Sequence, residues 1–217
     1  MQPPWESGRF RNRPSLTEAR RDIFPSLTKM IADIRAMQAD LDRILFDEAT
    51  IHRRLDELAA RISHDYRGRE LTVVAILNGS IILVADLLRR IPLPLKLDCV
   101  SVASYHGGVT PSDELIFRQV SLPDVAGRHV LILDDVLDSG ATLASIREKL
   151  ETAGPLNVRT CVLLVKKKAR ARVVDPDYVG FEIADEFVVG YGLDYLERYR
   201  NLPCIGVLRK DLIARMA

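Results

Sequence analysis

The sequence predicts an α/β protein, in which a central parallel β-sheet is flanked by helices. After Arg69 the chain contains short, continuous runs of apolar and β-branched residues, which is the pattern of strands buried on both faces. Helical patterns separate several of these runs, and the order strand, turn, helix, strand is typical of a parallel sheet with right-handed crossovers. Ligands of such sheets bind at the carboxyl ends of the strands.

The composition is that of an ordinary globular protein. The chain has 217 residues, of which 47% are hydrophobic, so it can bury a sizeable core. Its 31 basic and 30 acidic residues leave a net charge of +1, and no overall field would draw it onto nucleic acid or an anionic membrane. Any polyanion that it binds must therefore be small and bound by a local group of residues. We expect neither nucleic acid nor a membrane as a partner.

The sequence favours a cytoplasmic location. The amino terminus has no apolar core of the kind that a secretory signal needs, and the most apolar stretch, 71–88, is interrupted by polar residues. The cysteines Cys99, Cys161 and Cys204 are far apart in apolar segments, which is typical of buried thiols in a reducing compartment rather than of a metal site.

Residues 1–44 are predicted to form an extension of the main domain, which would cover 45–217. The first 14 residues are rich in Pro, Arg and Gly and are expected to form a loose, disordered arm. From Ser26, a plausible N-cap, apolar residues recur at helical spacing as far as Ile44. This helix is expected to pack on the domain or to serve in oligomerisation.

The main domain is predicted to contain three helices and six strands. Apolar residues at helical spacing predict a helix at 51–62, and two segments that lie between predicted strands, 81–90 and 141–152, are also predicted to be helices. Apolar runs place the strands at 71–77, 95–102, 129–133, 159–165, 187–189 and 204–208.

The segment VLILDDVLDSGATL, residues 130–143, ends an apolar strand in carboxylates beside a turn that suits an anion. The turn 138–142 lies at a predicted helix amino terminus, where backbone N–H groups and hydroxyls can bind a phosphate. Because like charges repel, we expect Asp134 and Asp135 to face hydroxyl groups, such as a ribose diol, or to hold a divalent cation indirectly. Asp138, at the tip, is free to act as a base.

A purely stabilising role is the alternative for each of these residues, because Asp is common at strand ends and helix N-caps. For any single residue the stabilising role and the functional role are equally favoured. For the whole series in this order, an apolar strand, Asp-Asp and then Asp-Ser-Gly-Ala-Thr, the functional role is strongly favoured. The segment resembles the signature of type I phosphoribosyltransferases that binds phosphoribosyl pyrophosphate (PRPP). Three further regions narrow the resemblance to the hypoxanthine-guanine phosphoribosyltransferase family: AILNGS at 75–80, SYHGG at 104–108, and LLVKKK at 163–168 with DYVGFEIADEFVVGYGLDYLERYR at 177–200.

This resemblance, which runs from about Leu45 to near the carboxyl terminus, implies a type I phosphoribosyltransferase fold. In that fold a small hood, formed by the carboxyl-terminal segment and nearby strands, accompanies the parallel sheet. The resemblance also implies the reaction: Mg²⁺-dependent transfer of a 5-phosphoribosyl group from PRPP to hypoxanthine or guanine, giving IMP or GMP and pyrophosphate. A homodimer or homotetramer is implied as well.

The resemblance assigns the phosphate and metal sites. Asp138 would accept the purine N7 proton as the catalytic residue. The PRPP site would comprise Asp134, Asp135, Asp138, Ser139, Gly140, Ala141 and Thr142. The pyrophosphate site would comprise Leu77, Asn78, Gly79 and Arg200, with Arg198 as the nearest candidate for misassignment. The carboxylates of Asp134, Asp135 and Asp194 would be associated with the metal.

The resemblance also assigns the base site, to Lys166, Phe187, Val188 and Leu137. Lys166 would donate to the purine 6-oxygen and so reject adenine, although it could instead begin a solvated basic run. Phe187 would stack on the purine, where core packing is the alternative. Ser104 and Tyr105 would belong to a flexible loop that closes over the site, where a surface hairpin is the alternative.

Three positions depart from the family pattern. Asn78 stands where the family often has Lys, which removes a positive charge from the pyrophosphate loop. Asp134 stands where many relatives have Glu, and Ala141 where some have Lys. Two other functions stay open at this point: a preference for xanthine, and a regulator that binds PRPP or nucleotide on the same fold without useful turnover.

Overall fold

A computed structural model of the chain describes residues 34–103, 116–117, 123–169 and 174–216. Residues 40–217 form one compact unit, which carries all the elements named below. In chain order these elements are β1 (Leu41–Phe46), α3 (Glu48–Asp65), β2 (Leu71–Leu77), α4 (Ile81–Leu88), β3 (Leu95–Ala103), β4 (Ile116–Phe117), β5 (His129–Leu137), α5 (Ala141–Glu151), β6 (Asn157–Lys166), β7 (Tyr178–Ile183), β8 (Val188–Val189), β9 (Ile205–Leu208) and α6 (Lys210–Met216).

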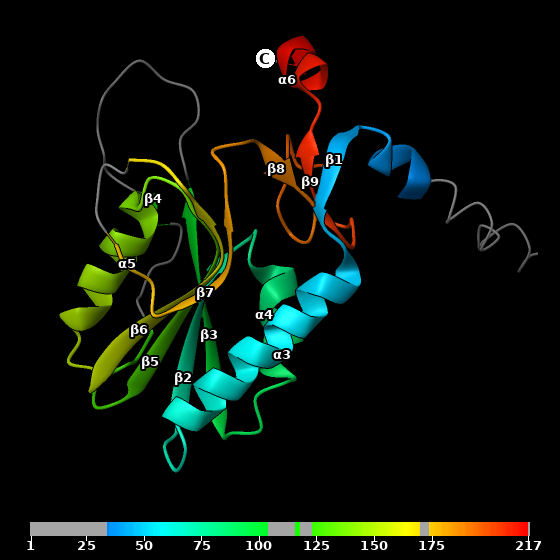
Figure 1. Cartoon of the computed structure of the whole chain (residues 1–217). Helices are drawn as coiled ribbons and strands as arrows, with labels where there is room; N and C mark the ends of the chain where they lie inside the picture. The colour runs from blue at the N-terminus through cyan, green and yellow to red at the C-terminus, as the bar shows by residue number, and fades with distance from the viewer. Residues whose placement is uncertain (1–33, 104–115, 118–122, 170–173, 217) are drawn as a thin grey trace, which may run out of the picture. The chain divides into compact units, whose positions relative to one another are not determined.

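The larger sheet has the strand order β4-β3-β2-β5-β6-β7. Its five long strands are parallel, and only the short edge strand β4 is antiparallel. Figure 1 shows these five strands running side by side, with their carboxyl ends toward the upper part of the view. The chain moves outward from β2 to β3 and then in the opposite direction through β5, β6 and β7. The crevice beyond β2 and β5 is therefore the point where a ligand is expected in such a sheet.

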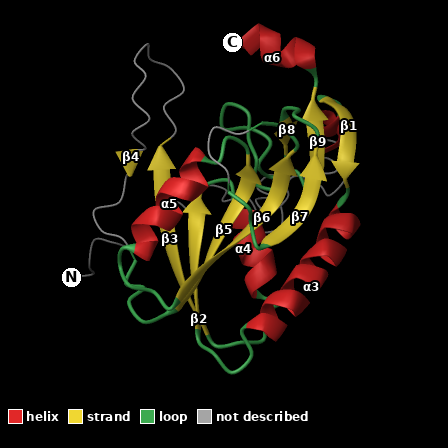
Figure 2. Ribbon diagram, turned by 60° about the vertical axis from the view of Figure 1, so that its left-hand side comes forward, coloured by secondary structure: helices red, strands yellow, loops and turns green. Residues whose placement is uncertain are grey.

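Helices cover the two faces of this sheet, as Figure 2 shows. Alternate residues of β5 point to opposite faces, because side chains alternate along a strand. Leu131 and Leu133 pack in the cluster with α3 and α4, whereas Val130 and Ile132 pack in the cluster with α5. The long apolar runs of the sequence thus reflect burial on both sides. No helix in the described residues is long and apolar enough to cross a lipid bilayer.

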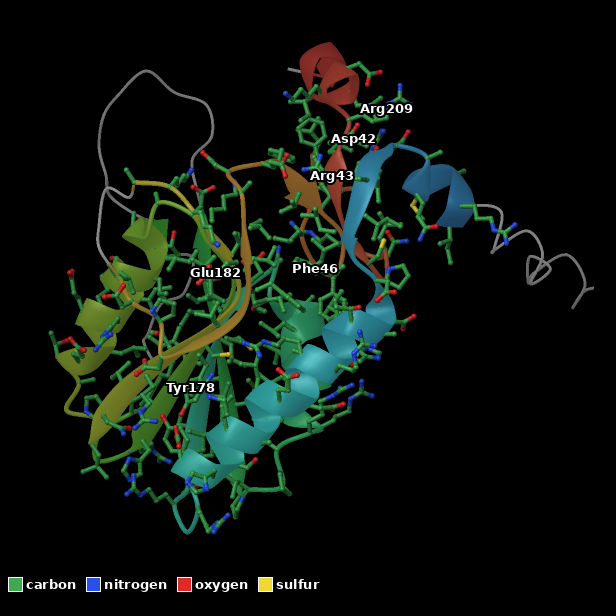
Figure 3. The ribbon with its side chains drawn as sticks, in the orientation of Figure 1. Asp42, Arg43, Phe46, Tyr178, Glu182 and Arg209 are labelled. Atoms are coloured by element: carbon green, nitrogen blue, oxygen red, sulfur yellow. The ribbon has the colours of Figure 1, made fainter. Side chains whose placement is uncertain are left out.

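A smaller sheet has the order β1-β9-β8, with antiparallel pairing throughout. Arg43 of β1 donates to both carboxylate oxygens of Glu186, at 2.6 and 2.5 Å, so the first strand is also tied to the segment before β8. Figure 3 shows Arg43 beside this sheet and Phe46 nearer the large one. The ring of Phe46 stacks on Phe181 of β7, with centroids 4.0 Å apart. This small sheet forms the hood.

The structure confirms the parallel α/β sheet, corrects one predicted element and adds β4, β7 and α6, which were not predicted. β2 has the predicted bounds, and the other five predicted strands are present with shifted ends. The predicted helix that reaches Ile44 is wrong in its last part: residues 34–38 are helical, but Leu41–Phe46 is a strand. Its backbone pairs with β9 (Leu41 with Leu208), and this long-range pairing outweighs the helical spacing. A domain boundary at residue 45 would divide this strand, whereas the compact unit begins at Asp40. Residues 1–33 lie outside the described chain.

Candidate active site

The turn between β2 and α4 brings backbone very close to a carboxylate. A Cβ on Gly79 would lie 1.7 Å from Oδ2 of Asp135, so only glycine fits there without a rearrangement. On the hood side, a Cβ on Gly192 would lie 2.0 Å from the carbonyl oxygen of Gly79. The peptide bond between Leu77 and Asn78 is cis. The predicted pyrophosphate loop is therefore enclosed between the end of β5 and the hood.

The end of β5 places two carboxylates side by side. Oδ1 of Asp134 accepts a hydrogen bond from the backbone N–H of Asp135 at 3.1 Å, and Oδ1 of Asp135 accepts from that of Val136 at 2.9 Å. Burial, followed by the charge of Asp135, raises the pKa of Asp134 well above its usual range. Burial also raises the pKa of Asp135, against the lowering effect of hydrogen bonds and Arg200. Such a pair would be stabilised by a cation.

The turn after Asp138 leads directly into α5. Gly140 precedes this helix with a φ of 81°, a left-handed conformation that favours glycine. Gly140 occupies the N-cap position and has no side chain that could cap the helix. Oγ of Ser139 accepts a hydrogen bond from the backbone N–H of Ala141 at 3.3 Å. An α-helix of 11 residues thus directs its amino terminus, where backbone N–H groups lack helical partners, toward the ends of the strands. This arrangement suits a phosphate.

The hood contributes an ion pair to the same region. Nη2 of Arg200 lies 2.8 Å from Oδ1 of Asp194, and its Nη1 donates to the carbonyl of Gly192 at 2.8 Å. Oδ2 of Asp194 accepts from the backbone N–H of Glu197 at 2.9 Å. The side chain of Arg200 is therefore held in a fixed position above the sheet.

These parts enclose one cavity of about 730 Å³. It is lined by Ile76, Asn78, Gly79, Ser101, Asp134, Asp135, Val136, Leu137, Asp138, Ser139, Gly140, Thr142, Leu143, Asp194, Glu197 and Arg200. The cavity thus combines the β2 turn, the end of β5, the start of α5 and the hood, which are distant in sequence.

A cluster of four charged side chains lies at the carboxyl ends of β5, β6 and β7, and we call it the Asp138 cluster. Oδ2 of Asp138 accepts from Nζ of Lys166 at 2.8 Å, and its Oδ1 accepts from Nζ of Lys168. Oδ1 of Asp185 lies 3.5 Å from Nζ of Lys166 and 3.3 Å from Nζ of Lys168. Burial raises the pKa of Asp138, but the hydrogen bonds and charges of the two lysines outweigh it, and the pKa is lowered. Asp138 is thereby held as a carboxylate.

The segment around β8 carries one exposed aromatic side chain. Phe187 is 41% exposed and meets Tyr195 edge to face, with ring centroids 5.3 Å apart. Val188, the next residue, is buried and pairs with Val207 of β9. An exposed aromatic next to a buried strand leaves a ring face for a planar ligand.

The structure brings together most of the residues that the sequence singled out. Those that line the cavity are Asn78, Gly79, Asp134, Asp135, Leu137, Asp138, Ser139, Gly140, Thr142, Asp194 and Arg200. Five others do not line it: Leu77, Ala141, Lys166, Phe187 and Val188. Lys166 still contacts the cavity residue Asp138. Ser104 and Tyr105 lie outside the described residues. Arg198 does not line the cavity, so the geometry favours Arg200 of the two arginines.

Sequence reasoning missed several residues of this region. Ser101, at the end of β3, and Glu197, in the hood, both line the cavity. Lys168 and Asp185 join the Asp138 cluster, although the run of basic residues after Lys166 favours a solvated side chain for Lys168. The available signal was positional: Asp185 follows β7 as Lys168 follows β6, and the ends of adjacent parallel strands meet.

Known proteins resemble this chain over most of its length. The phosphoribosyl transferase domain family matches residues 44–196. The hypoxanthine-guanine phosphoribosyltransferase of Staphylococcus epidermidis is 40% identical over 179 residues, which cover 82% of this chain and 100% of the relative. That of Streptococcus pneumoniae is 38% identical over 176 residues, 81% of this chain and 98% of the relative.

Solved structures agree with the sequence relatives. A crystal structure of a hypoxanthine phosphoribosyltransferase from Staphylococcus aureus matches with a TM-score of 0.77 and 40% identity, over 82% of this chain and 96% of that one. A hypoxanthine phosphoribosyltransferase from Trypanosoma cruzi matches with a TM-score of 0.75 and 34% identity, over 81% and 95%. The fold is that of the type I phosphoribosyltransferases, as the resemblance implied, and the chain belongs to the hypoxanthine-guanine phosphoribosyltransferase family.

Proposed function

We propose that this chain transfers the 5-phosphoribosyl group of PRPP to hypoxanthine or guanine and releases pyrophosphate. One observation carries the proposal: a single cavity joins a helix amino terminus suited to a phosphate, a carboxylate pair suited to a ribose diol, and Asp138, which is paired with Lys166. The product would be IMP or GMP, and the role would be purine salvage.

The phosphates of PRPP would occupy the two ends of the cavity. The 5-phosphate would be held by backbone and hydroxyl groups of the turn 138–142 at the start of α5. The pyrophosphate would lie along the backbone of the turn at Leu77, Asn78 and Gly79 and would meet the guanidinium of Arg200, whose planar fork suits it. Asn78 brings an amide in place of the ammonium that is common in the family, so Arg200 is the single cation among the described lining residues.

The purine would lie against the Asp138 cluster. As N9 bonds to C1′ of the ribose, the C1′–O bond to pyrophosphate breaks, and the N7–H proton passes to the carboxylate of Asp138. The ammonium of Lys166 would donate to the 6-oxygen, a contact that the 6-amino group of adenine cannot make. Phe187 would stack on the ring, while Leu137 and Val188 would border it.

The carboxylates of the cavity fit a Mg²⁺ ion. Mg²⁺ binds oxygen ligands, commonly one or two carboxylates together with substrate phosphates. Within the described residues, no three His, Cys, Asp or Glu side chains form a preformed metal cluster. Asp134 and Asp135, whose raised pKa values a cation would lower, and Asp194 would hold the ion together with the substrate. The ion would neutralise negative charge that develops on the pyrophosphate.

The assembly and location of the protein are part of the proposal. We expect a homodimer or homotetramer in the cytoplasm, with an extension of the catalytic domain that ends at Ala39, before β1, instead of at residue 44. For the Trypanosoma cruzi relative, the role of the carboxyl-terminal region in oligomeric state and activity has been addressed. Light scattering of the full chain, beside a variant that lacks the first 33 residues, would measure the oligomeric state of this protein and the influence of the extension on it.

The test is a steady-state assay with PRPP, Mg²⁺ and each of hypoxanthine, guanine, xanthine and adenine. We expect turnover of the first two bases. Asp138→Asn should lower kcat by about 10²- to 10⁴-fold, the range for loss of a general base. Lys166→Met should lower kcat/KM for 6-oxopurines by at least about tenfold. Lys167→Met is the matched control, since Lys167 is exposed and pairs with Glu182.

Other outcomes would assign a different function. A higher kcat/KM for xanthine than for hypoxanthine and guanine would make the chain a xanthine-preferring enzyme. If calorimetry shows that PRPP binds while none of the four bases is turned over, the chain is a regulator on this fold and the proposal is wrong.

A further inference from the structure

The Asp138 cluster contains a cation that the proposed reaction does not yet use. The two oxygens of Asp138 are held by different lysines, Oδ2 by Lys166 and Oδ1 by Lys168. Asp185 lies within 3.5 Å of both ammonium groups. The four side chains thus alternate in charge, two positive and two negative.

The backbone fixes which lysines face Asp138. The N–H of Lys167 donates to the carbonyl of Ile183 in β7 at 2.8 Å, and the N–H of Lys168 donates to the carbonyl of Lys166 at 3.1 Å. The side chain of Lys167 is 66% exposed and pairs with Glu182 at 2.9 Å. Of three consecutive lysines, the first and third therefore reach Asp138, and the middle one does not.

The proposed reaction requires this cluster to open. Lys166 must donate to the purine 6-oxygen, and Asp138 must accept the N7 proton, yet in the ligand-free structure they are hydrogen-bonded to each other. Among the described residues, Lys166 and Lys168 are the cations whose side chains lie within 4.0 Å of the Asp138 carboxylate. When Lys166 turns to the base, Lys168 is the cation that remains.

We propose that Lys168 is a positioning residue for this reaction: it keeps its hydrogen bond to Oδ1 of Asp138 while Oδ2 of Asp138 exchanges its hydrogen bond with Lys166 for one with the purine N7–H. The inference rests on the proposed function. The N7–H bond breaks, the Oδ2–H bond forms, and the electron pair stays on the purine ring as N9 bonds to C1′. Asp185 keeps Lys168 beside the cluster, because its carboxylate lies 3.3 Å from that ammonium.

The charged groups around Asp138 come from the carboxyl ends of three strands. Asp134 and Asp135 lie in β5, which Asp138 follows directly, the two lysines lie at the end of β6, and Asp185 follows β7. The lysines lower the pKa of Asp138 against the effect of burial, and the hydrogen bond with Asp138 raises the pKa of Lys168. Removal of Lys168 should therefore raise the pKa of Asp138, because an opposite charge near a carboxylate favours its ionised form.

The test compares Lys168→Met and Lys168→Arg with the wild-type full chain, and uses Lys167→Met as the matched control. Carboxyl ¹³C NMR follows the titration of Asp138 in the ligand-free protein, with Asp138→Asn to assign the signal. The pH profile of kcat/KM for hypoxanthine follows the same group during turnover.

We expect Lys168→Met to move both the titration and the acidic limb of the profile to higher pH. On that limb kcat/KM should fall about tenfold, with a much smaller loss on the plateau. Lys168→Arg should restore both, since the charge is kept, and Lys167→Met should change neither. If Lys168→Met fails to fold, Lys168→Gln takes its place.

Two results would overturn the inference. One is an Asp138 titration that is the same in Lys168→Met and in wild type. The other is a loss of activity of equal size at every pH. If the wild-type chain turns over no 6-oxopurine, the proposed function fails instead, and the NMR comparison still decides whether Lys168 holds Asp138.

Discussion

The two ends of the parallel sheet shift the pKa values of their carboxyl groups in opposite directions. At the amino ends of β6 and β7, Asp65 accepts hydrogen bonds from the hydroxyl of Tyr178 at 2.7 Å and from Arg159 at 2.8 Å. The hydrogen bond from Tyr178 is the largest cause of a lowered pKa of Asp65. At the carboxyl end of β5, Asp134 is buried beside Asp135, and its pKa is raised. One end stabilises its carboxylate, and the other holds a buried pair whose pKa values are raised even though the charge of Arg200 acts on Asp135.

This difference separates stability from function within one sheet. The hydrogen bonds of Asp65 come from the protein itself and are complete without a ligand. The carboxylates of β5 line the cavity, and ionisation of both is unfavourable until a hydroxyl or cation reaches them. Functional sites commonly carry such local cost, which the rest of the fold offsets. Three substitutions test this difference between the two ends of the sheet.

The largest effect is expected at the carboxyl end, from Gly79→Ala. The new Cβ would overlap the carboxylate of Asp135, so the turn or the carboxylate must move. We expect kcat/KM to fall by at least about 100-fold, since small displacements of a positioned group are that costly. Gly68→Ala is the control: that residue lies before β2, at the opposite end of the strand, and a Cβ there meets nothing within 4 Å. It should lower the melting temperature because of its positive φ, without loss of activity. Near wild-type activity of Gly79→Ala would show that close packing against Asp135 is not needed.

A smaller effect, on stability alone, is expected at the amino end from Tyr178→Phe. Loss of the hydroxyl removes a hydrogen bond to a charged group and should lower the free energy of unfolding by about 1 to 2 kcal/mol. Since the pKa of Asp65 is lowered in the folded protein, this contribution is present above the unfolded pKa of about 3.9 and is lost as the pH falls through the folded pKa. Urea unfolding at pH 7 and at successively lower pH would measure it.

The matched control for that variant is Asp56→Asn, which removes an exposed ion pair with Arg90 and should change stability by less than about 0.5 kcal/mol. Activity should be unchanged in both variants. A stability difference between wild type and Tyr178→Phe that is independent of pH would contradict the role given to Asp65.

The smallest effect, and one of opposite sign, is expected from Asp134→Asn in protein freed of divalent ions. The neutral amide relieves the repulsion between two buried carboxylates, so the free energy of unfolding at pH 7 should rise by about 1 kcal/mol while turnover falls. Thermal unfolding of both proteins with EDTA would measure the gain. A loss of stability would mean that Asp134 is stabilised by its hydrogen bond to Asp135 more than it is destabilised by burial.

Local pattern was sufficient for the parts of the fold that depend on neighbours in sequence. The run Leu71–Leu77 was predicted as a strand with its observed bounds, because burial on both faces leaves a continuous apolar run. The segment 134–142 placed a carboxylate pair and a helix amino terminus next to each other, since strand, turn and helix follow within a few residues. Local sequence was therefore enough to predict four of the buried strands of the large sheet, β2, β3, β5 and β6, and the phosphate end of the cavity.

Tertiary structure decided the features that join distant segments. The strand Leu41–Phe46 exists because it pairs with β9, more than 150 residues later. The backbone of Gly79 is close to Asp135 because β2 and β5 are neighbours in the sheet. Lys168 reaches Asp138, and Asp185 reaches Lys166 and Lys168, only because the order β5-β6-β7 brings three strand ends together. Such contacts depend on strand order and register, which are set by the packing of the whole core and leave no local signal in the sequence.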